Sequence, residues 1–507
     1  MKLRVRCLGL DAGGKTIAII NSENSRELGV RSLERIVLKS GSKKLTVVVN
    51  VSDDFVMEGD IVVYNEVKDL LKLRNGDFVH VAARPDLESK MYIGKKISGQ
   101  ELSEKEINVI INDVLSHNLN DLELASFVTA LHINGLSMNE DYYFAKAFIG
   151  SSSERIRFPG VVVDKHSCGG VCGDKTTMIL VPIIAAAGLT IPKTSSRAIT
   201  APAGTADRVE AVAPVIHDVK RIHDIVKKTN GCMVWGGSLD LAPADDLLIQ
   251  IEKPLEIDPL IIPSVLAKKK TVGSRYVVID IPTGPDAKIK TKEDAERIAN
   301  RFISVGKKVG MHVECVVTKA DQPIGFAIGP ALEAKEALHA LMNPNNAPKD
   351  LVDKATSLAG VLLRMVGKGD KRTAEKILFS GKAEKKFREI VKAQGGNYNI
   401  KPGDLDKKII VINVKSKKSG YVSYINNKIL IRLAKLAGAP KDKYAGILLK
   451  SKLGHKARKG EVVYEIHVEN PAKIGMVKKH LKQGDGILIT GKAMKMVIEE
   501  IDHIRKK

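Results

Sequence analysis

The stretch "VVVDKHSCGGVCGDKTT", from Val161 to Thr177, decides the fold expected for this chain. Its valines predict a short buried strand, its glycines predict a loop, and the apolar run from Thr176 to Ala187 predicts a helix. Backbone N–H groups of such a loop can approach an anion closely, while Lys165 and the hydroxyls of Ser167 and Thr177 add charge and donors. We expect a phosphate-type site here. A glycine turn that only packs strand against helix is the alternative.

A second loop of the same kind is "TSSRAITAPAGTADRVE", from Thr194 to Glu210. It is rich in hydroxyl and cationic donors, and two breakers, Pro202 and Gly204, precede an expected helix over 205–212. Ligands of open α/β sheets bind at the carboxyl ends of the strands. Two such loops at one sheet edge would suit two phosphate-like groups, or one phosphate and a sugar.

The rest of the chain divides by its periodicity. Residues 1–85 alternate as short strands with a repeated Gly-Asp-x-Val turn, which indicates a small barrel. Ser103 and Glu106 form a capping box before an amphipathic helix, and later strands alternate with helices. The expected fold is α/β and multi-domain: a small β-barrel-like domain (1–85), a helical domain (86–155, with 240–272 packing on it), an α/β domain with a mainly parallel sheet (156–239 and 273–400) and an α+β domain (401–507).

The segment "GLDAGGKT", residues 9–16, also matches the phosphate-loop pattern G-x-x-x-x-G-K-[ST]. That pattern binds nucleotides only where a helix follows the loop, because the helix N-terminus holds the phosphates. Here the β-branched run 16–21 follows and the alternating run 3–8 precedes, so both flanks are typical of strands. We therefore predict a β-hairpin turn without phosphate chemistry.

Composition narrows the class of protein. The 507 residues are 44% hydrophobic and contain neither an apolar run long enough to span a bilayer nor a signal peptide, which favours a soluble cytoplasmic protein. The net charge of +22 suits nucleic acid or a small anion, but aromatic residues make up only 4%, so a solvated basic surface is favoured. Cys168 and Cys172 follow His166 without a second pair at zinc spacing, so no metal is expected.

Four runs of residues carry a resemblance to a known family. They are Asp164 to Asp174, Ser195 to Thr205, Ser264 to Lys269, and Gln322 to Gly325. In order and spacing they resemble the thymidine phosphorylase family of nucleoside phosphorylases, from about residue 86 to the C-terminus. The extra N-terminal β-domain and the runs "SRAITA" and "PTGPDAKIKT" are similar to the archaeal branch of that family that acts on AMP.

The resemblance implies phosphorolysis in nucleotide salvage. Phosphate would attack C1′ of a nucleoside 5′-monophosphate, AMP first and CMP and UMP as further candidates, and release the base and ribose 1,5-bisphosphate. Phosphate is then a co-substrate, no cofactor is needed, and the partners are these small molecules and further copies of the chain, as a homodimer or larger homo-oligomer, rather than nucleic acid or membrane. Family contacts to phosphate fall on Lys165, Ser167 and Ser195. Those to the nucleotide fall on Gly170, Ser196, Arg197, Ala198, Ile199, Thr200, Ala201, Thr205, Ser264 and Lys288.

Cleavage also needs an acid, because the leaving base takes the electrons of the glycosidic bond. The family's catalytic acid falls on Asp258. The spacing from there to Ser264 is shorter than in the family, so Glu256 is the alternative. Such a carboxyl would need a raised pKa to hold its proton near neutral pH, and Asp258 before Pro259 also suits a plain helix N-cap.

Two positions keep alternatives open. Lys288 stands where nucleoside-specific relatives carry an apolar residue, and a cation suits a substrate with its own 5′-phosphate; the alternative is one more surface lysine. His166 could donate to phosphate or to the sugar, or could serve packing alone.

Other functions also stay open. A pyrimidine nucleoside phosphorylase would share the loops, although the arginine that pyrimidine-specific relatives place ahead of the Ser264 helix is missing here. A phosphoribosyltransferase would need more metal-binding acids than Asp174. A basic RNA-binding protein is the candidate from another class.

Overall fold

The computed structural model describes residues 1–84, 86–152, 156–198 and 201–491, apart from the side chain of Ser238. It consists of two compact units, one of residues 1–151 with 243–260 and the other of residues 152–242 with 261–507. The domain boundaries expected from the sequence stay predictions.

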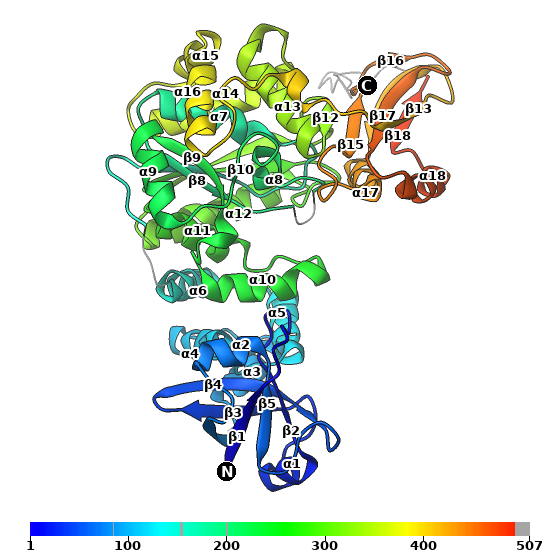
Figure 1. Ribbon diagram of the computed structural model, residues 1–507. Helices are drawn as coiled ribbons and strands as arrows, with labels where there is room; N and C mark the ends of the chain where they lie inside the picture. Colours follow the sequence, from blue (N-terminus) through cyan, green and yellow to red (C-terminus); the bar gives the residue numbers. More distant parts are fainter. Residues whose placement is uncertain (85, 153–155, 199–200, 492–507) are drawn as a thin grey trace, which may run out of the picture. The chain divides into compact units, whose positions relative to one another are not determined.

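The first unit begins with a closed β-barrel in the strand order β1-β5-β2-β4-β3-β6 (Figure 1). Alternate aliphatic side chains such as Leu3, Val5, Ile36 and Val79 fill its interior, as in other small barrels. The barrel-like domain predicted at the N-terminus is therefore confirmed. The strands are β1 (Lys2–Cys7), β2 (Ile17–Ile20), β3 (Arg35–Ser40), β4 (Lys43–Val51), β5 (Asp60–Val63) and β6 (Phe78–Ala83).

Two expectations for this barrel are wrong. Segment 9–16 is not a hairpin turn, because β5 lies between β1 and β2, parallel to the first and antiparallel to the second. Local sequence cannot reveal a strand inserted from a distance. The domain is also not all-β, since α1 (Ser22–Leu28) and α2 (Asn65–Leu71) connect its strands. Helices this short show no helical periodicity in the sequence.

A layer of helices completes the first unit. The predicted capping box is present: Ser103 N–H donates to the Glu106 carboxylate at 2.7 Å, and Glu106 N–H donates to Ser103 Oγ at 3.4 Å. Arg84, just after the barrel, pairs with Glu123 of the helical layer at 3.1 Å. The helices are α3 (Glu88–Ile97), α4 (Glu104–Leu115), α5 (Asp121–Asn134), α6 (Met138–Ser151) and α10 (Pro243–Leu255).

The second unit is built on a parallel sheet, which confirms the α/β class. Strands β11-β10-β7 pair in parallel, strands β8-β9 pair in parallel, and a parallel bridge between Val162 and Thr190 joins the two pieces. All these strands therefore point their carboxyl ends in the same direction. They are β7 (Val163–Ser167), β8 (Ile191–Ser195), β9 (Gly231–Trp235), β10 (Tyr276–Thr283) and β11 (His312–Lys319).

Helices pack on this sheet, and α7 (Thr176–Ala186) is the most apolar of those that shape the site. Every residue from Thr176 to Ala185 is buried, which explains its unbroken run of apolar side chains. The helix predicted over 205–212 is shorter and ends at Val209. The others are α8 (Thr205–Val209), α9 (Val219–Thr229), α11 (Ile261–Thr271), α12 (Lys292–Lys308), α13 (Pro330–Met342), α14 (Lys349–Met365), α15 (Lys371–Phe379) and α16 (Lys382–Ala393).

The C-terminal part of the second unit adds two small sheets, β12-β15-β17-β13 and β16-β14-β18. Its core takes in Cys172 and Ile328 from outside the range 401–507, so it packs directly on the α/β part. Its elements are β12 (Ala327–Ile328), β13 (Ile410–Lys415), β14 (Gly420–Ile425), α17 (Asn427–Ala437), β15 (Gly446–Leu449), β16 (Lys456–Ala457), β17 (Val462–Val468), α18 (Ile474–Leu481) and β18 (Ile487–Thr490).

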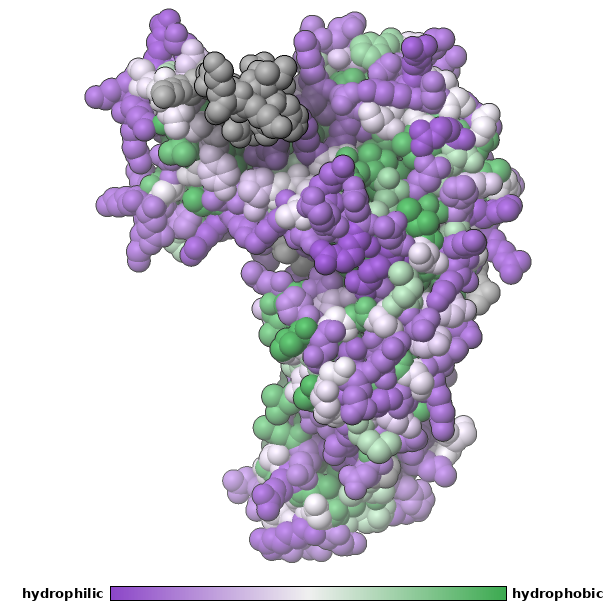
Figure 2. All heavy atoms as spheres, turned by 180° about the vertical axis from the view of Figure 1, so that it is seen from behind, coloured by the Kyte–Doolittle hydropathy of each residue, from purple (hydrophilic) through white to green (hydrophobic). Residues whose placement is uncertain are grey.

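On the face seen in Figure 2, hydrophilic residues predominate and hydrophobic patches are small and scattered. Within the described residues, each helix is too short or too polar to cross a bilayer.

Candidate functional site

The predicted glycine loop occupies residues 168–175, between the end of β7 and the start of α7. Gly169, Gly170 and Gly173 all adopt positive φ. A Cβ on Gly170 would lie 2.5 Å from the backbone N of Lys288, and one on Gly173 would lie 2.6 Å from the carbonyl O of Ile324. Only glycine therefore lets this loop pack against the loops that follow β10 and β11.

Buried ion pairs surround the loop. The Lys165 ammonium lies 3.7 Å from Asp174 and 3.9 Å from Asp280, while Lys354 lies 2.8 Å from Asp280. Burial opposes the charge of Asp174, yet the two lysines hold the pKa of its carboxyl well below the usual range. The two lysines and two aspartates thus balance one another.

In a second group of buried charges, the positive charges outnumber the negative ones. The Asp164 carboxylate lies 2.7 Å from Lys269 and 3.6 Å from Lys193. Burial, and then the ammonium groups of Lys269 and Lys165, lower the pKa of Lys193 against the attraction of Asp164. Over the two groups, four lysines share three aspartates, so Lys193 has no carboxylate of its own. A buried cation in this situation favours the binding of an anion.

His166 lies among these lysines. Its pKa is well below the usual value for histidine, first because the ring is removed from water and second because Lys269, Lys193, Lys165 and Lys288 repel a further proton. The ring is therefore neutral near pH 7 and can accept or donate one hydrogen bond. Its electrostatic neighbours also place Lys288 in the surroundings of the cluster.

The second predicted loop follows β8 and folds around Asp207. That carboxylate accepts hydrogen bonds from the N–H groups of Ala198 at 2.7 Å and Gly204 at 2.8 Å. A Cβ on Gly204 would lie 2.5 Å from the carbonyl carbon of Arg197, so the turn requires glycine. Asp207 therefore fixes both ends of the loop.

The Arg197 guanidinium is already engaged by the protein. It makes a bidentate pair with Glu210 at 2.8 Å, lies 3.2 Å from Asp207, and sits over the Trp235 ring at 5.2 Å. These carboxylates raise the pKa of Arg197 further above its usual value. Ser195, at the end of β8, directs its hydroxyl to the carbonyl O of Val234 at 3.2 Å.

The structure brings many of the predicted residues to one sheet edge. Ser167 and Ser195 are the last residues of β7 and β8, and Lys165 stands in the middle of β7. Gly170 meets Lys288, and Ser264 lies on α11. Ser196, Arg197, Ala198 and Ala201 lie in the second loop, and Thr205 begins α8. Ile199 and Thr200 lie outside the described residues.

Asp258 belongs to the other compact unit, in the segment after α10 ends at Leu255. Helix α11 begins only at Ile261, so the Asp258-Pro259 pair does not form its first turn. Glu256, the alternative acid, is exposed and has a φ of 55°.

Three lysines of the cluster were missed as site residues: Lys193, Lys269 and Lys354. Lys193 stands inside a short strand and is only 4% exposed. A charged residue in a buried strand was the available signal, because burial of an ammonium group is costly unless a partner or ligand accepts it.

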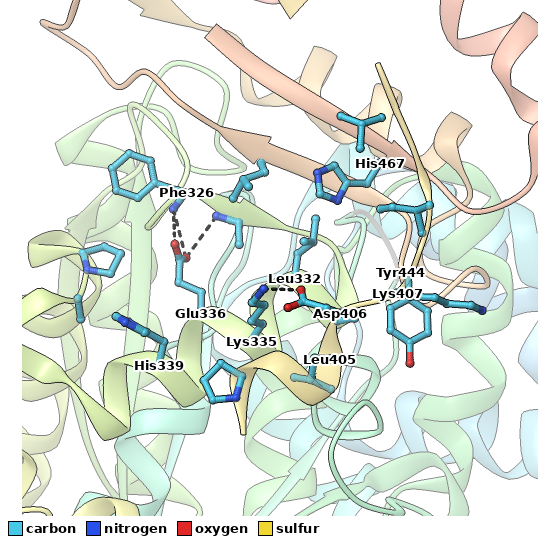
Figure 3. Close-up of a pocket in the computed structure, with 18 of the residues that line it drawn as sticks. Phe326, Leu332, Lys335, Glu336, His339, Leu405, Asp406, Lys407, Tyr444 and His467 are labelled. Atoms are coloured by element: carbon cyan, nitrogen blue, oxygen red, sulfur yellow. Dashed lines mark hydrogen bonds and ion pairs between the residues drawn. The ribbon is translucent and has the colours of Figure 1, made fainter. Parts of the chain in front are cut away.

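A cavity of about 680 Å³ lies elsewhere in the second unit. Figure 3 shows Lys335, Glu336 and His339 along α13 on one side of it and Tyr444 and His467 on the other. Its walls are mostly apolar, and Lys335 pairs with Asp406. Among the predicted phosphate and nucleotide residues that the structure describes, none lines this cavity.

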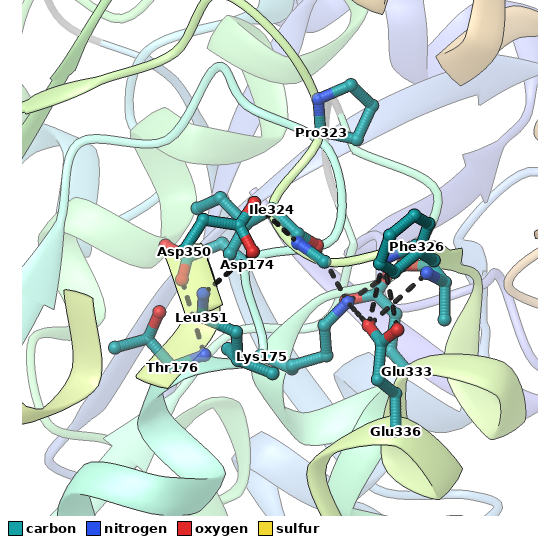
Figure 4. Close-up of polar contacts among 12 residues, drawn as sticks. Asp174, Lys175, Thr176, Pro323, Ile324, Phe326, Glu333, Glu336, Asp350 and Leu351 are labelled. Atoms are coloured by element: carbon teal, nitrogen blue, oxygen red, sulfur yellow. Dashed lines mark hydrogen bonds and ion pairs between the residues drawn. The ribbon is translucent and has the colours of Figure 1, made fainter. Parts of the chain in front are cut away.

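A buried lysine at the end of the glycine loop connects it to the loop after β11. Lys175 donates to the carbonyl oxygens of Ile324 at 2.8 Å and Ala327 at 3.0 Å and pairs with Glu336 (Figure 4). The same Glu336 carboxylate accepts from the N–H of Phe326 at 3.0 Å. The loop after β11 is therefore tied to the loop after β7.

Two cysteines belong to the glycine loop. Cys168 and Cys172 are buried, and burial raises the pKa of the Cys172 thiol above its usual value. Over the described ranges, no three His, Cys, Asp or Glu side chains converge so as to hold a metal ion.

Comparison with known proteins places this fold in a class. Residues 90–152 match the Glycosyl transferase family, helical bundle domain, and residues 159–384 match the Glycosyl transferase family, a/b domain. Anthranilate phosphoribosyltransferase from Thermus thermophilus has a similar fold, with a TM-score of 0.51 and 17% identity over 60% of this chain and 98% of that one. A helical bundle and a parallel-sheet domain of this kind define the glycosyl transferase class.

Relatives of much higher identity extend over the barrel as well. The chain is 44% identical to AMP phosphorylase of Thermofilum pendens, covering 99% of this chain and 98% of the relative. It is 43% identical to AMP phosphorylase of Thermococcus kodakarensis, covering 99% and 100%. The chain belongs to the AMP phosphorylase family.

Proposed function

We propose that this protein catalyses the phosphorolysis of AMP. The bond between C1′ and the adenine nitrogen breaks, a bond between C1′ and a phosphate oxygen forms, and the products are adenine and ribose 1,5-bisphosphate. The observation that carries the proposal is the buried lysine cluster around Asp164, built on β7, β8 and α11, in a chain that matches AMP phosphorylases over nearly its full length.

Inorganic phosphate is held by Lys165, Ser167 and Ser195. This assignment is supported by the place of Ser167 and Ser195 at the carboxyl ends of β7 and β8 and of Lys165 within β7, near a lysine that lacks its own carboxylate. Ser195 must turn its hydroxyl away from Val234 to donate to phosphate, which an O–H group can do by rotation. Lys193 adds attraction without needing to touch the anion.

The nucleotide is held by the loops after β8 and β10 and by α11. Arg197, engaged by two carboxylates, fixes its loop so that the backbone of Ser196, Arg197 and Ala198 faces the substrate. The exposed ammonium of Lys288 pairs with the 5′-phosphate, which distinguishes AMP from adenosine. The nucleotide residues are Gly170, Ser196, Arg197, Ala198, Ile199, Thr200, Ala201, Thr205, Ser264 and Lys288.

Asp258 is the acid that gives its proton to the leaving adenine, and Glu256 is the alternative. As the glycosidic bond breaks, the ribose gains oxocarbenium character, and the bound phosphate dianion stabilises that charge before it attacks. CMP and UMP are further substrates. The enzyme acts in the cytoplasm in nucleotide salvage, as a homodimer or larger homo-oligomer, and needs no cofactor.

The test is product release from AMP and from adenosine, each with and without phosphate. Adenine release from AMP that depends on phosphate supports the proposal. Release from adenosine, thymidine or uridine but not from AMP overturns it in favour of a nucleoside phosphorylase. No turnover, together with salt-sensitive retention of RNA, overturns it in favour of RNA binding.

The acid is assigned by two matched variants. Asp258→Asn abolishes turnover while AMP binding stays largely intact, because the amide keeps the shape of the carboxyl but its N–H protons are not acidic enough to be given to the leaving base. Glu256→Gln serves as the control. A fully active Asp258→Asn enzyme would transfer the role to Glu256.

A further inference from the structure

We propose that Asn427, with Asp286 and Tyr424, positions the loops of the candidate site, so that the C-terminal part of the chain sets the selectivity for a 5′-phosphate. The positional claim stands on the geometry alone. The claim about selectivity rests on the proposed function.

Asn427 is the first residue of α17 and is fully buried. Its backbone N–H donates to Asp286 Oδ2 at 3.1 Å, and its side-chain Nδ2 donates to the carbonyl O of Ala320 at 3.2 Å. Its own carbonyl O accepts from the Cys172 thiol at 3.4 Å. One residue thus makes three polar contacts to three separate segments.

The three partners follow three neighbouring strands of the sheet. Cys172 lies in the loop after β7, Asp286 in the loop after β10, and Ala320 directly after β11. The sheet order is β11-β10-β7, so Asn427 spans the carboxyl edge at which the candidate site is built. A residue that served only the C-terminal fold would have no reason to contact all three loops.

Asp286 accepts two hydrogen bonds from the C-terminal part of the chain. The same Oδ2 atom also accepts from the Tyr424 hydroxyl at 2.7 Å. Burial and the neighbouring carboxylate raise the pKa of Tyr424 to about 12, so the hydroxyl stays protonated and donating. The carboxylate also lies at the N-terminus of α17, where the helix dipole favours a negative charge.

The C-terminal part also forms hydrogen bonds with the loop after β11. Leu453 N–H donates to Gln322 Oε1 at 2.9 Å, and Lys452 Nζ donates to the carbonyl O of Gly325 at 2.8 Å. Lys175 and Glu336 also form hydrogen bonds with this loop, as Figure 4 shows. The C-terminal part therefore holds the loop after β11 at several points.

The position of Lys288 follows from this arrangement. Lys288 is two residues after Asp286, and its backbone N lies against Gly170, where no Cβ can fit. A loop held on one side by Asp286 and pressed on the other by Gly170 has little freedom. Loss of the Asp286 contacts should let Lys288 move away from the place where it meets the 5′-phosphate.

The experiment compares Asp286→Ala, Asp286→Asn and Tyr424→Phe with Tyr421→Phe, a matched control on the same strand. The selectivity readout is the ratio of kcat/KM for AMP to kcat/KM for adenosine. Asp286→Ala should lower this ratio at least about tenfold, and Tyr424→Phe about threefold, the factors expected for two and one lost hydrogen bonds. Asp286→Asn should stay near the wild type because its amide oxygen can accept both bonds, and Tyr421→Phe should match the wild type.

Amide hydrogen exchange of the unliganded protein gives a readout that does not depend on activity. Asp286→Ala should speed exchange in 284–290 and 320–326 at least about fivefold while α16 stays protected as in the wild type. Unchanged exchange in those loops, or faster exchange throughout the chain, would overturn the positioning role. A wild type that releases no adenine from AMP would instead overturn the proposed function, and the exchange result would still decide the positioning role.

Discussion

The two glycine-rich loops at residues 9–16 and 168–175 have similar residue types but different surroundings in the structure. In the loop 9–16, the N–H groups of Ala12 and Gly14 each donate to the Glu66 carboxylate at 2.8 Å. These backbone donors lower the pKa of Glu66, so the chain's own carboxylate occupies the place where a phosphate would bind. The loop 168–175 is instead flanked by the buried lysine cluster. The phosphate-loop pattern alone therefore does not show whether a loop binds phosphate. The group that accepts hydrogen bonds from the loop's N–H groups decides this, and the pattern does not specify that group.

The backbones of the two loops also differ in how tightly they are enclosed. Gly14 and Gly170 have similar φ values, 86° and 91°. A Cβ on Gly14 meets nothing within 4 Å, whereas one on Gly170 would lie 2.5 Å from a backbone N. Gly14 is needed only for the backbone conformation of a turn. Gly170 is needed also because another loop packs directly against it.

The largest effect should come from alanine at these two glycines. Gly170→Ala must displace the Lys288 loop, so kcat/KM for AMP should fall at least about 100-fold and the protein should lose about 3 kcal/mol of stability. Gly14→Ala meets only the unfavourable φ, which costs about 1 kcal/mol, and its activity should be unchanged. Kinetics and thermal unfolding of the pair measure both. Equal losses of activity and stability in the two variants would show that the close packing around Gly170 has no effect of its own.

The next effect should come from the lysine without its own carboxylate. Lys193→Met should raise the KM for phosphate about tenfold and shrink the increase in Tm that phosphate gives the wild type. The unliganded variant should be no less stable, because the pKa of Lys193 is lowered on folding and its charged form therefore opposes the fold below pH 10.5. Lys227→Met, at an exposed position of α9, is the control. A Lys193→Met enzyme with an unchanged KM would show that this cation does not serve the anion.

A smaller effect is expected from removing the internal anion of the other loop. Glu66→Ala should lower the Tm at pH 7 without changing activity. The folded pKa of Glu66 lies below its ordinary value of 4.5, so its contribution is present above that pH and disappears as pH falls through the folded pKa. Unfolding of wild type and variant in denaturant from pH 7 down to about pH 3 should therefore converge. A constant gap over that range would point to lost packing instead.

The smallest effect is expected at the lysine that completes the phosphate-loop pattern. Lys15 pairs with Asp121 at 2.9 Å, and both side chains are about two thirds exposed. Lys15→Ala should leave activity unchanged and alter stability by less than about 1 kcal/mol, as is usual for exposed ion pairs. A loss of phosphorolysis in this variant would restore the loop 9–16 as a candidate site.

The sequence predicted those features that are encoded locally. The capping box at Ser103 and the apolar helix from Thr176 depend on neighbouring residues, and both are present in the structure. The strand predicted from the valines 161–163 is shifted along the chain, because β7 begins at Val163 and runs to Ser167, so that it includes Lys165. The hairpin at 9–16 failed because strand pairing is non-local, and β5 separates the two strands. The helix from Ser22 was missed because its seven residues, six of them polar, show no apolar stripe.

The candidate site divides in the same way. Lys165 and Ser167 were predicted as site residues because glycines and donors cluster around them in sequence. Lys193 and Lys354 were missed because each is a single lysine whose role depends on aspartates from other strands. The contacts of Asn427 join segments more than one hundred residues apart and leave no local signal.

The closed barrel has a consequence for how copies of this protein can associate. Each of its strands is paired on both sides, so the described barrel offers no free strand edge to a neighbouring chain. Association through this domain by addition of a strand is therefore excluded, and so is the edge-to-edge stacking that leads β-proteins to aggregate. Any contact between barrels must be made by side chains, and point substitutions on the outer surface can remove it without unfolding the domain.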